Sequence, residues 1–328
     1  MNKKIINVTA AVIVKDGRVL AARRAPGKHL EGYWEFPGGK LEENETPEEC
    51  LERELTEEFS ISSRVGAYIG ESVYDYGEKV IRLLAYEVEH TAGDFELVDH
   101  DELRWLDIDQ LADVKWAPAD IPLVEQYEAQ ARAIGYYSNN AIEYCEETSA
   151  IDVGNLYYPF LNYLSPGARI LDLGCGSGRD SKAFREMGYD VTSVDGSPEI
   201  ADWARAFTGH PVFVKDFQHI DFNAEYDGVW ASASLLHCHR DKLQDVIRKI
   251  MESLKDEAVA YMSFKWGEFS SVDDRGRQFT NQTTNSLRLL LRNVENTEIL
   301  KTWDSEIELR GQPQKWAYAI IRRRGGRI

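Results

Sequence analysis

The pattern of strand-like and helix-like segments changes partway along this 328-residue chain, and no other feature limits its possible folds so strongly. Up to residue 132, strand-like runs surround one acidic helix, which is typical of an α+β fold with a mixed sheet. From residue 168 onward, apolar strands alternate with amphipathic helices, which is typical of βαβ units. A single core rarely extends over so long a chain. We therefore expect two domains, at residues 1–132 and 133–328.

The second pattern predicts an α/β fold on a mostly parallel, seven-stranded sheet. Five apolar runs alternate with helical stretches, and two late strand-like runs predict an antiparallel pair that closes the sheet. The expected strands are 169–173, 190–194, 211–214, 226–231, 258–264, 297–309 and 315–323. A short helix is expected at 122–134, and the Tyr- and Asn-rich segment 135–165 is expected to lie between the two halves.

The charge of the chain disfavours some classes of ligand. Its 38 Lys and Arg against 56 Asp and Glu give a net charge of −18. Residues 1–132 alone hold 15 Lys and Arg against 28 Asp and Glu, a net charge of −13. A field of this sign repels a polyphosphate backbone, so long nucleic acid is not expected as a ligand. A small anionic substrate can still bind where metal ions or local basic residues offset the repulsion.

Neither a membrane span nor a secretion signal is predicted. No segment approaches the ~20 apolar residues that cross a bilayer. The apolar run 5–14 is followed by an Asp16-Gly17 turn and a second strand-like run, so we interpret it as part of a hairpin. The four cysteines have no metal-binding spacing. We expect a cytoplasmic protein, and no feature of the sequence predicts its oligomeric state.

The most informative local segment is an acidic helix predicted to begin after Thr46. The Thr46 side chain can cap the helix, and Pro47 suits its first position. Glu49, three residues after the cap, can complete a capping box. These three residues predict where the helix begins, and they fix which later residues share a face.

Three carboxylates are predicted to share one face of this helix. Glu54, Glu57 and Glu58 are spaced at i, i+3 and i+4. Three bare carboxylates at such spacing repel one another unless they are solvated or bridged by cations. Mg²⁺ prefers hard oxygen ligands and often binds substrate phosphates as well. The spacing therefore favours a divalent-metal site, with a solvated acidic face as the alternative.

The same residues resemble the Nudix signature. That signature is Gly, five residues, Glu, seven residues, Arg-Glu, an aliphatic, any residue, Glu-Glu, any residue, Gly and an aliphatic. Eight of its nine defined positions match, and Ser60 replaces the second glycine, at an expected cost on the order of 1 kcal/mol in backbone strain. The matching residues are Gly39, Glu45, Arg53, Glu54, Leu55, Glu57, Glu58 and Ile61.

The wider likeness covers roughly residues 5–132 and is to the MutT and CTP-pyrophosphohydrolase branch, of which the run 34–40 is typical. It implies hydrolysis of nucleoside triphosphates or related diphosphates to a monophosphate and pyrophosphate, including housecleaning of modified nucleotides, with Mg²⁺ or Mn²⁺. By this resemblance the metal ligands are Glu54, Glu57, Glu58 and Gly39. It also implies phosphate contacts from Arg23 and Lys40, an extra ligand or base at Asp99, and a nucleobase contact from Asp120.

A second candidate site is a glycine-rich turn at 174–178 that ends a strand and opens a helix. Glycines let the backbone turn sharply and approach a ligand closely. Asp172 precedes the turn, where an acid would repel a pyrophosphate but suits a cationic amino-acid group. Asp195 ends the next strand, where an acid can hold ribose hydroxyls. Asp216 ends the third strand, within reach of an adenine amine.

This combination resembles class I S-adenosylmethionine-dependent methyltransferases over roughly residues 137–328, with a Rossmann-like fold. An NAD-binding fold and a purely structural turn are the alternatives. By the resemblance, the cofactor is S-adenosylmethionine. The residues implied to bind it are Gly174, Gly176 and Gly178 at the methionine moiety near Asp172, Asp195 at the ribose, and Asp216 with Phe217 at the adenine.

The methyl acceptor is less constrained by the sequence. Residues 231–239 lack the motifs of DNA amino- and cytosine-methylating enzymes, so a small-molecule acceptor is favoured, with RNA or protein as the alternative. His237 is a candidate base for methyl transfer, the alternative being a helix-start residue that lines the cofactor pocket. A lid over the cofactor, or aromatic packing, is expected from Tyr136, Tyr137, Asn140 and Tyr144.

Together these features favour a bifunctional enzyme with a pyrophosphohydrolase and a methyltransferase domain. Two competing interpretations remain open. In the first, the N-terminal half senses a nucleotide and regulates the methyltransferase. In the second, the C-terminal half is a binding domain without catalysis.

Overall fold

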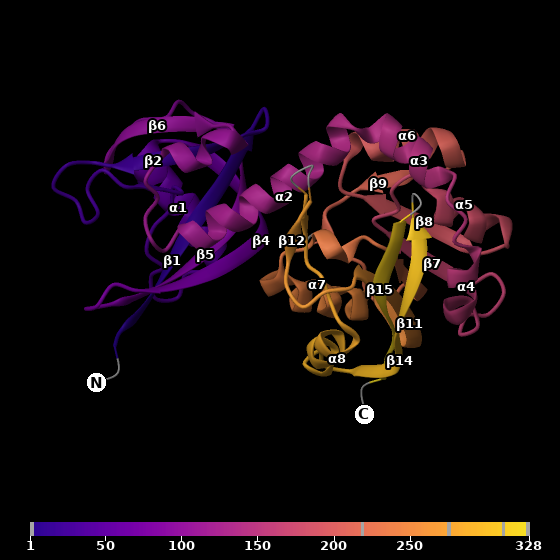
Figure 1. Cartoon of the computed structure of the whole chain (residues 1–328). Coiled ribbons are helices and arrows are strands. Elements are labelled where there is room, and N and C mark those ends of the chain that lie inside the picture. The colour runs from indigo at the N-terminus through magenta and orange to yellow at the C-terminus, as the bar shows by residue number, and fades with distance from the viewer. Residues whose placement is uncertain (1–2, 218–219, 274–276, 310–311, 326–328) are drawn as a thin grey trace. The chain divides into compact units, whose positions relative to one another are not determined.

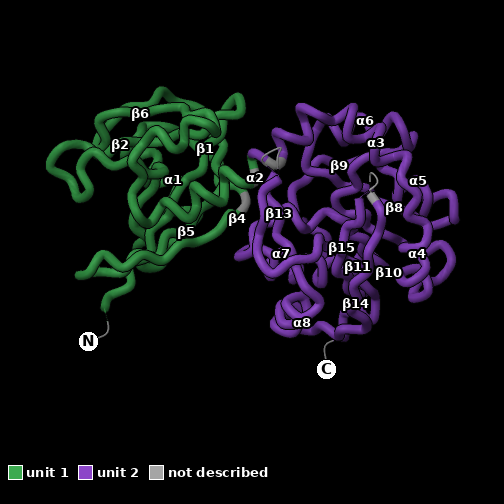
Figure 2. Tube along the Cα trace, in the orientation of Figure 1, with its two compact units in different colours: residues 1–131 green, residues 132–328 purple. Residues whose placement is uncertain are grey.

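The chain forms two compact units, residues 1–131 and 132–328 (Figure 2). The computed structural model describes residues 3–217, 220–273, 277–309 and 312–325. Among the helices within those ranges, none is long and apolar enough to span a membrane. Figure 1 labels many of the helices and strands of both units.

Unit 1 is built on a mixed, six-stranded sheet, which confirms the expected α+β fold. The strand order is β3-β2-β1-β5-β4, with β6 also paired to β2, and only β1 and β5 run parallel. The elements are β1 (Ile5–Lys15), β2 (Arg18–Arg24), β3 (Trp34–Glu35), α1 (Pro47–Phe59), β4 (Ser62–Asp75), β5 (Val80–Ala92), β6 (His100–Leu106), the 3₁₀ helix η1 (Ile108–Asp113) and α2 (Ile121–Asn139).

The two faces of this sheet are buried under different helices, because successive side chains of a strand point to opposite faces. Ala11 and Ile13 of β1 belong to a buried cluster with Leu55 of α1. Val12, between them, belongs to a second cluster with Leu123 of α2. The sheet is therefore covered on both sides. The apolar side of α1 packs against the sheet, so its acidic residues lie on a different side of the helix.

Helix α1 begins as the sequence predicts. Thr46 Oγ1 accepts a hydrogen bond from the Glu49 backbone N–H at 3.2 Å, and Glu49 Oε2 accepts one from the Thr46 N–H at 2.9 Å. The helix ends at Ser60, which has left-handed backbone angles of φ 56° and ψ 26°. Ser60 thus adopts the conformation that the signature glycine normally supplies.

Unit 2 is built on a seven-stranded sheet in the order β14-β15-β11-β10-β7-β8-β9. The pairs from β11 to β9 are parallel and those that join β14, β15 and β11 are antiparallel, so the expected mostly parallel sheet is confirmed. The strands are β7 (Arg169–Leu173), β8 (Asp190–Asp195), β9 (Val212–Val214), β10 (Tyr226–Ala231), β11 (Leu254–Lys265), β14 (Thr297–Leu309) and β15 (Gln312–Arg323), with a small hairpin of β12 (Ser271–Val272) and β13 (Gln278–Phe279).

The helices of unit 2 flank this sheet (Figure 1). They are α3 (Ala141–Ser149), α4 (Gly154–Leu161), α5 (Arg179–Glu186), α6 (Pro198–Thr208), the 3₁₀ helix η3 (Leu235–His237), α7 (Arg240–Ser253) and α8 (Thr284–Arg292). The loops after β7, β8 and β10 leave the same edge of the parallel sheet, where ligands of such folds bind.

The segment between the two halves differs from expectation. The predicted short helix at 122–134 continues to Asn139 as α2, and the division between the units falls inside it. Residues 135–165 contain the end of α2 together with α3 and α4. Gly135 lowers the helix propensity by only about 1 kcal/mol and does not break the helix.

Candidate active sites

The acidic face of α1 is organised by one arginine. Arg53 Nη1 donates to Glu54 Oε1 at 2.9 Å and to Glu57 Oε2 at 3.2 Å. Its Nε and Nη2 donate to the two carboxylate oxygens of Glu45 at 2.7 and 3.0 Å. The guanidinium hydrogen bond lowers the pKa of Glu45 to about 2. Arg53 therefore binds three of the signature carboxylates at once.

Glu58 has a different environment from the other two glutamates of the face. It is oriented toward His100, whose Nδ1 lies 3.7 Å from Glu58 Oε2. The pKa of Glu58 is raised to about 7, chiefly by burial and in smaller part by the carboxylates of Glu54, Asp99 and Glu35, while His100 lowers it. A cation beside Glu58 would favour the charged carboxylate that burial disfavours.

The glycine of the signature allows a close approach to this face. A side-chain carbon at Gly39 would overlap the carboxyl group of Glu54. The Gly39 backbone is itself held by a hydrogen bond of 2.8 Å from the Thr9 N–H to the Gly39 carbonyl oxygen. A larger residue at this position would have to displace the Glu54 carboxyl group.

The chemistry of these donors suits a hard divalent cation, although the carboxylates do not converge. Within the described ranges, no three Asp, Glu, His or Cys side chains are already arranged to hold a metal ion. Glu54 and Glu57 are engaged by Arg53, and Glu58 lies near His100. A bound cation would therefore draw the three carboxylates closer together and compete with Arg53 for Glu57, which is the most exposed of them.

Of the predicted phosphate-binding and base residues, Lys40 and Asp99 lie near the acidic face, whereas Arg23 lies over the Trp34 ring, in the cluster that faces α2. Arg23 is paired with Asp101 at 2.7 Å and with Glu102 at 2.7 Å. Asp99 is paired with Lys28 at 2.6 Å. Lys40 is exposed, and its carbonyl oxygen accepts a hydrogen bond of 3.4 Å from Arg53.

Asp120, the residue predicted to contact the nucleobase, is buried. Its Oδ1 accepts a hydrogen bond from the Phe36 N–H at 2.9 Å, and only 4% of the residue is exposed. Burial raises the pKa of Asp120 well above its usual range, and Glu35 raises it further. The carboxyl group thus fixes the backbone of the run 34–37 next to the acidic helix.

The glycine turn of unit 2 has the backbone that its sequence predicts. Gly174, Gly176 and Gly178 all have positive φ, at 75°, 53° and 76°. A side-chain carbon at Gly174 would lie 2.5 Å from Ser234 Cβ, and one at Gly176 would lie 3.3 Å from the Tyr144 hydroxyl oxygen. The turn is therefore closely covered on both sides.

The acids around this turn are fixed by hydrogen bonds. Asp195 accepts from the Gly176 N–H at 2.9 Å and from the Ser197 N–H at 3.0 Å, and burial raises its pKa. Asp172 is buried and accepts from the Ser181 hydroxyl at 2.5 Å. Burial, and next the neighbouring Asp180, raises the pKa of Asp172.

The remaining predicted residues of unit 2 lie around the same turn. Phe217 is partly buried, 3.3 Å from the position that a Gly174 side-chain carbon would take. Asp216 precedes it after β9. His237 Nε2 lies 2.7 Å from the Tyr137 hydroxyl, and burial lowers the pKa of His237 to about 3. Tyr137 in turn packs edge-on against Tyr144, with ring centroids 4.8 Å apart.

A hollow of about 180 Å³ lies beside the turn. Its lining includes Gly174, Gly176, Tyr144, Ser263 and Trp316, so it is bounded by the glycine turn, α3, β11 and β15. Ligand pockets usually enclose about 300–1,000 Å³. This hollow is therefore small for a ligand pocket.

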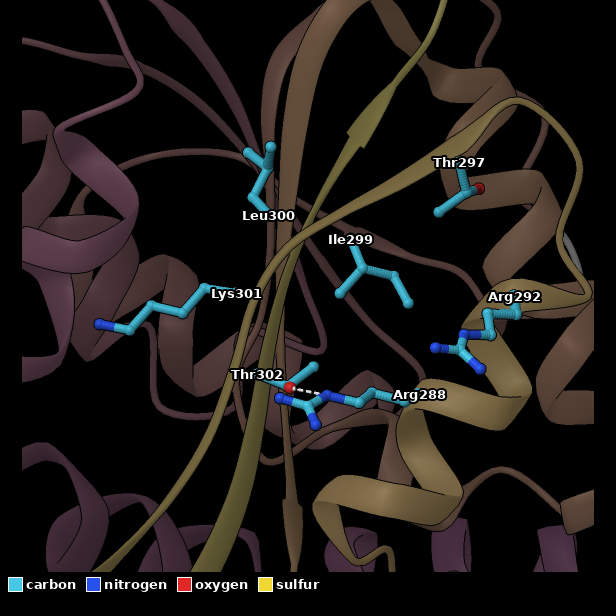
Figure 3. Close-up of a pocket in the computed structure, with 7 residues that line it drawn as sticks. All are labelled: Arg288, Arg292, Thr297, Ile299, Leu300, Lys301 and Thr302. Carbon is cyan, nitrogen blue, oxygen red and sulfur yellow. Dashed lines mark hydrogen bonds between the residues drawn. The ribbon is translucent and has the colours of Figure 1, made fainter.

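A second hollow of unit 2 is basic and lies elsewhere, between α8 and the start of β14 (Figure 3). It measures about 620 Å³ and contains Arg288, Arg292 and Lys301 in its lining. Figure 3 shows both arginines extending from α8 toward the strand, where Arg288 Nε donates to Thr302 Oγ1 at 2.5 Å. None of the predicted site residues lines this hollow.

Sequence reasoning did not identify three of the residues that shape these sites. His100 and Glu35 meet beside Glu58 although they are 65 positions apart in the chain. Asp180 accepts hydrogen bonds from the Tyr157 hydroxyl and the Trp230 indole, each at 2.8 Å, beneath the glycine turn. The only sequence signal for His100 was its position next to Asp99.

Two family models match the chain. The NUDIX domain matches residues 3–127, and the methyltransferase domain matches residues 170–257.

Relatives of each unit are known. The CTP pyrophosphohydrolase of Escherichia coli is 37% identical over 126 residues, which are 38% of this chain and 93% of that protein. The malonyl-[acyl-carrier protein] O-methyltransferase of Enterobacter lignolyticus is 33% identical over 94 residues, which are 28% of this chain and 37% of that protein. A Burkholderia thailandensis 1,6-didemethyltoxoflavin-N1-methyltransferase structure, with S-adenosylhomocysteine bound, has a TM-score of 0.51 at 20% identity and covers 61% of this chain and 90% of its own. The last likeness concerns the fold alone.

Proposed function

The chain belongs to the Nudix family through its first unit and carries a methyltransferase domain in its second, and from this premise we propose that it is a bifunctional enzyme. The first activity is Mg²⁺- or Mn²⁺-dependent hydrolysis of nucleoside triphosphates to monophosphates and pyrophosphate, including modified nucleotides. The second is S-adenosylmethionine-dependent methylation of a small molecule. In the proposal the Nudix domain comprises residues 1–132, the methyltransferase domain comprises residues 133–328, and the enzyme is cytoplasmic.

The observation that supports the hydrolase most strongly is the crowding of carboxylates on α1. In the proposal, Glu54, Glu57, Glu58 and the Gly39 carbonyl hold the metal. When bound, the metal neutralises phosphate charge and makes a water more acidic. Arg53 keeps Glu54 and Glu45 in place. When the metal binds, Arg53 gives up its longer bond to Glu57 and keeps its bonds to Glu54 and Glu45.

The residues around the acidic face bind and orient the substrate in this proposal. Arg23 and Lys40 contact the phosphates, for which Arg23 exchanges one of its two carboxylate partners for a phosphate oxygen. Asp99, an exposed ion-pair partner of Lys28, serves as an extra ligand or base. Asp120 acts at the nucleobase subsite through the Phe36 backbone that it holds.

The residues of unit 2 position a cofactor and shield it from water. S-adenosylmethionine, when bound, supplies an electrophilic methyl group. Gly174, Gly176 and Gly178 leave space for its amino-acid part, with Asp172 beneath them. Asp195 accepts hydrogen bonds from two backbone N–H groups, and its carboxylate has further lone pairs that can accept from two ribose hydroxyls. Asp216 and Phe217 contact the adenine.

His237 is a candidate base in this second reaction. Burial lowers its pKa to about 3, so the imidazole is neutral at physiological pH but accepts a proton only weakly in this conformation. Its hydrogen bond with Tyr137 would orient the ring and place it under the aromatic cover. Exclusion of water by that cover favours in-line displacement of the methyl group.

The hydrolase is tested by incubating the full chain with Mg²⁺ and a panel of ordinary and oxidised nucleoside triphosphates. Release of pyrophosphate with a monophosphate product supports the proposal. Tight nucleotide binding without release of pyrophosphate would instead favour a sensor that regulates the methyltransferase. The second activity is tested by formation of S-adenosylhomocysteine from S-adenosylmethionine with pools of small molecules, RNA or protein as acceptors.

A further inference from the structure

His100 lies buried between the sheet and α1 of unit 1. It begins β6, and only 2% of its side chain is exposed. Its ring stacks on Phe59, with centroids 5.0 Å apart and an interplanar angle of 25°. Phe59 is the residue after Glu58 on the acidic helix, so the stacked pair fixes the imidazole at the side of the predicted metal ligands.

Both nitrogens of this imidazole face carboxylates. Nε2 lies 2.9 Å from Glu35 Oε1, within hydrogen-bond distance. Nδ1 lies 3.7 Å from Glu58 Oε2 and has no hydrogen-bond partner within the described residues. Nδ1 is therefore the ring nitrogen that faces Glu58, across a distance somewhat longer than a hydrogen bond.

The Glu35 side of this arrangement is rigid. Arg24 Nη1 donates to both carboxylate oxygens of Glu35, each at 2.8 Å. Arg24, Glu35 and His100 come from β2, β3 and β6, which are three strands of one sheet. The sheet therefore holds Glu35, and Glu35 holds the imidazole.

Glu58 is the one glutamate of the acidic face that Arg53 does not bind among the contacts of the described residues. Arg53 engages Glu45, Glu54 and Glu57. On the other side of the acidic face, the neighbour of Glu58 is the imidazole of His100. Two different groups, a guanidinium from the helix and an imidazole from the sheet, flank the three carboxylates.

We propose that His100 is a positioning residue, which holds the Glu58 carboxylate in place for the divalent cation through a chain of contacts from Arg24 and Glu35. This inference rests on the proposed hydrolase function of unit 1. It assigns no contact between His100 and the substrate or the metal. Its effect passes only through the position of Glu58.

The test is the affinity of the full chain for Mn²⁺ without nucleotide, measured from the free-Mn²⁺ signal in electron paramagnetic resonance. His100→Phe keeps the stack on Phe59 and removes both nitrogens. Loss of a residue that orients a metal ligand typically costs about 10–100-fold in metal affinity, and we expect a loss in that range. The Mg²⁺ concentration for half-maximal hydrolysis should rise in parallel.

Two further variants separate positioning from a general packing role. His100→Gln, whose amide can donate to a carboxylate, should retain clearly more Mn²⁺ affinity than His100→Phe. His90→Phe is the matched control, because His90 lies on β5 and, among the residues that the structure describes, its Nε2 has hydrogen-bond contacts only with the Ala92 and Gly93 carbonyl oxygens. That control should bind Mn²⁺ like the wild type.

Each outcome decides between the two claims. If the wild type binds Mn²⁺ and His100→Phe, folded by circular dichroism, binds it equally well, the positioning role is wrong and the hydrolase proposal stands. If the wild type neither binds Mn²⁺ nor hydrolyses nucleotides with Mg²⁺, both fail. If His100→Phe does not fold, His100→Gln and Glu35→Gln carry the comparison, and wild-type affinity in both overturns the inference.

Discussion

Glu57 is the most exposed of the three carboxylates on the acidic face, with 60% of its side chain accessible, against 13% for Glu54 and 21% for Glu58. It is therefore the ligand that substitution should remove with least damage to the core. We expect Glu57→Gln to lower kcat by at least about 100-fold, since loss of groups that merely orient metal ligands already costs 10–100-fold. Steady-state pyrophosphate release measures the effect.

The matched control for this change is Glu52→Gln. Glu52 lies on the same helix and is exposed, but it is not part of the shared face. It should retain near-normal turnover. Equal activity in Glu57→Gln and Glu52→Gln would remove the metal assignment of Glu57.

His237 leads to a prediction about stability and pH. Burial lowers its pKa to about 3, from about 6.5 in an unfolded chain. Below pH 6.5 the unfolded chain binds a proton that the folded chain does not, so folding stability falls as the pH falls. The free energy of unfolding of unit 2 should decrease by up to about 1.4 kcal/mol per pH unit from this group. Urea titrations between pH 7 and 5 measure it.

In that experiment His237→Gln should flatten the dependence on pH. His239→Gln, two residues along the chain, should leave it unchanged. A slope in His237→Gln equal to that of the wild type would show that other groups cause the acid sensitivity.

Sequence spacing predicted the residues of the acidic site that share one helix. It did not predict those that come from distant parts of the chain. The three glutamates of α1 follow from i, i+3 and i+4 spacing, because helix geometry alone puts them on one face. The hydrogen bonds of Arg53 to Glu45, Glu54 and Glu57 are less directly predictable from this spacing. His100 and Glu35 depend on strand pairing across the sheet, for which no local pattern exists.

At the scale of elements, helix ends were predictable where a capping residue marks them. The start of α1 follows from Thr46, Pro47 and Glu49, all of which act as their chemistry predicts. The end of α2 was not predictable from Gly135, because packing at both ends of the helix outweighs one weak helix former. Leu123 belongs to a buried cluster of unit 1, and Tyr137 packs with Tyr144 in unit 2.

The end of α1 provides a prediction at this scale. Ser60 holds left-handed angles that cost a residue with a side chain about 1–2 kcal/mol relative to glycine. Glycine also has more freedom in the unfolded chain, which offsets part of the gain. Ser60→Gly should therefore raise the free energy of unfolding of unit 1 by about 0.5–1 kcal/mol without changing kcat.

Denaturant titration of unit 1 checks this prediction. Ser62→Gly, in the extended strand β4, is the control and should be neutral or destabilising. A destabilised Ser60→Gly would mean that the exposed hydrogen bond from Ser60 to Glu96 matters more than the backbone strain.

At the scale of the whole molecule, each unit has its own buried clusters, so ligands should stabilise the units separately. S-adenosylhomocysteine at ~100-fold over its Kd should add ~2.7 kcal/mol to unfolding of unit 2 and nothing to unit 1. Calorimetry of the full chain should show one transition that moves. With Asp195→Ala the shift should shrink or vanish; no shift in the wild type would end the methyltransferase proposal.

The continuity of α2 has a practical consequence for anyone who expresses the halves separately. If the halves are expressed separately with the boundary between residues 131 and 132, each protein contains only part of α2, and the cut end of the helix is expected to fray. Such a cut keeps Leu123 and Val124 in the first half and Tyr137 and Ser138 in the second, where each pair makes its contacts. It nevertheless divides the helix that holds both pairs in place. Overlapping clones that both include residues 121–139 would give each product a whole helix, at the expense of some solvent-exposed apolar surface.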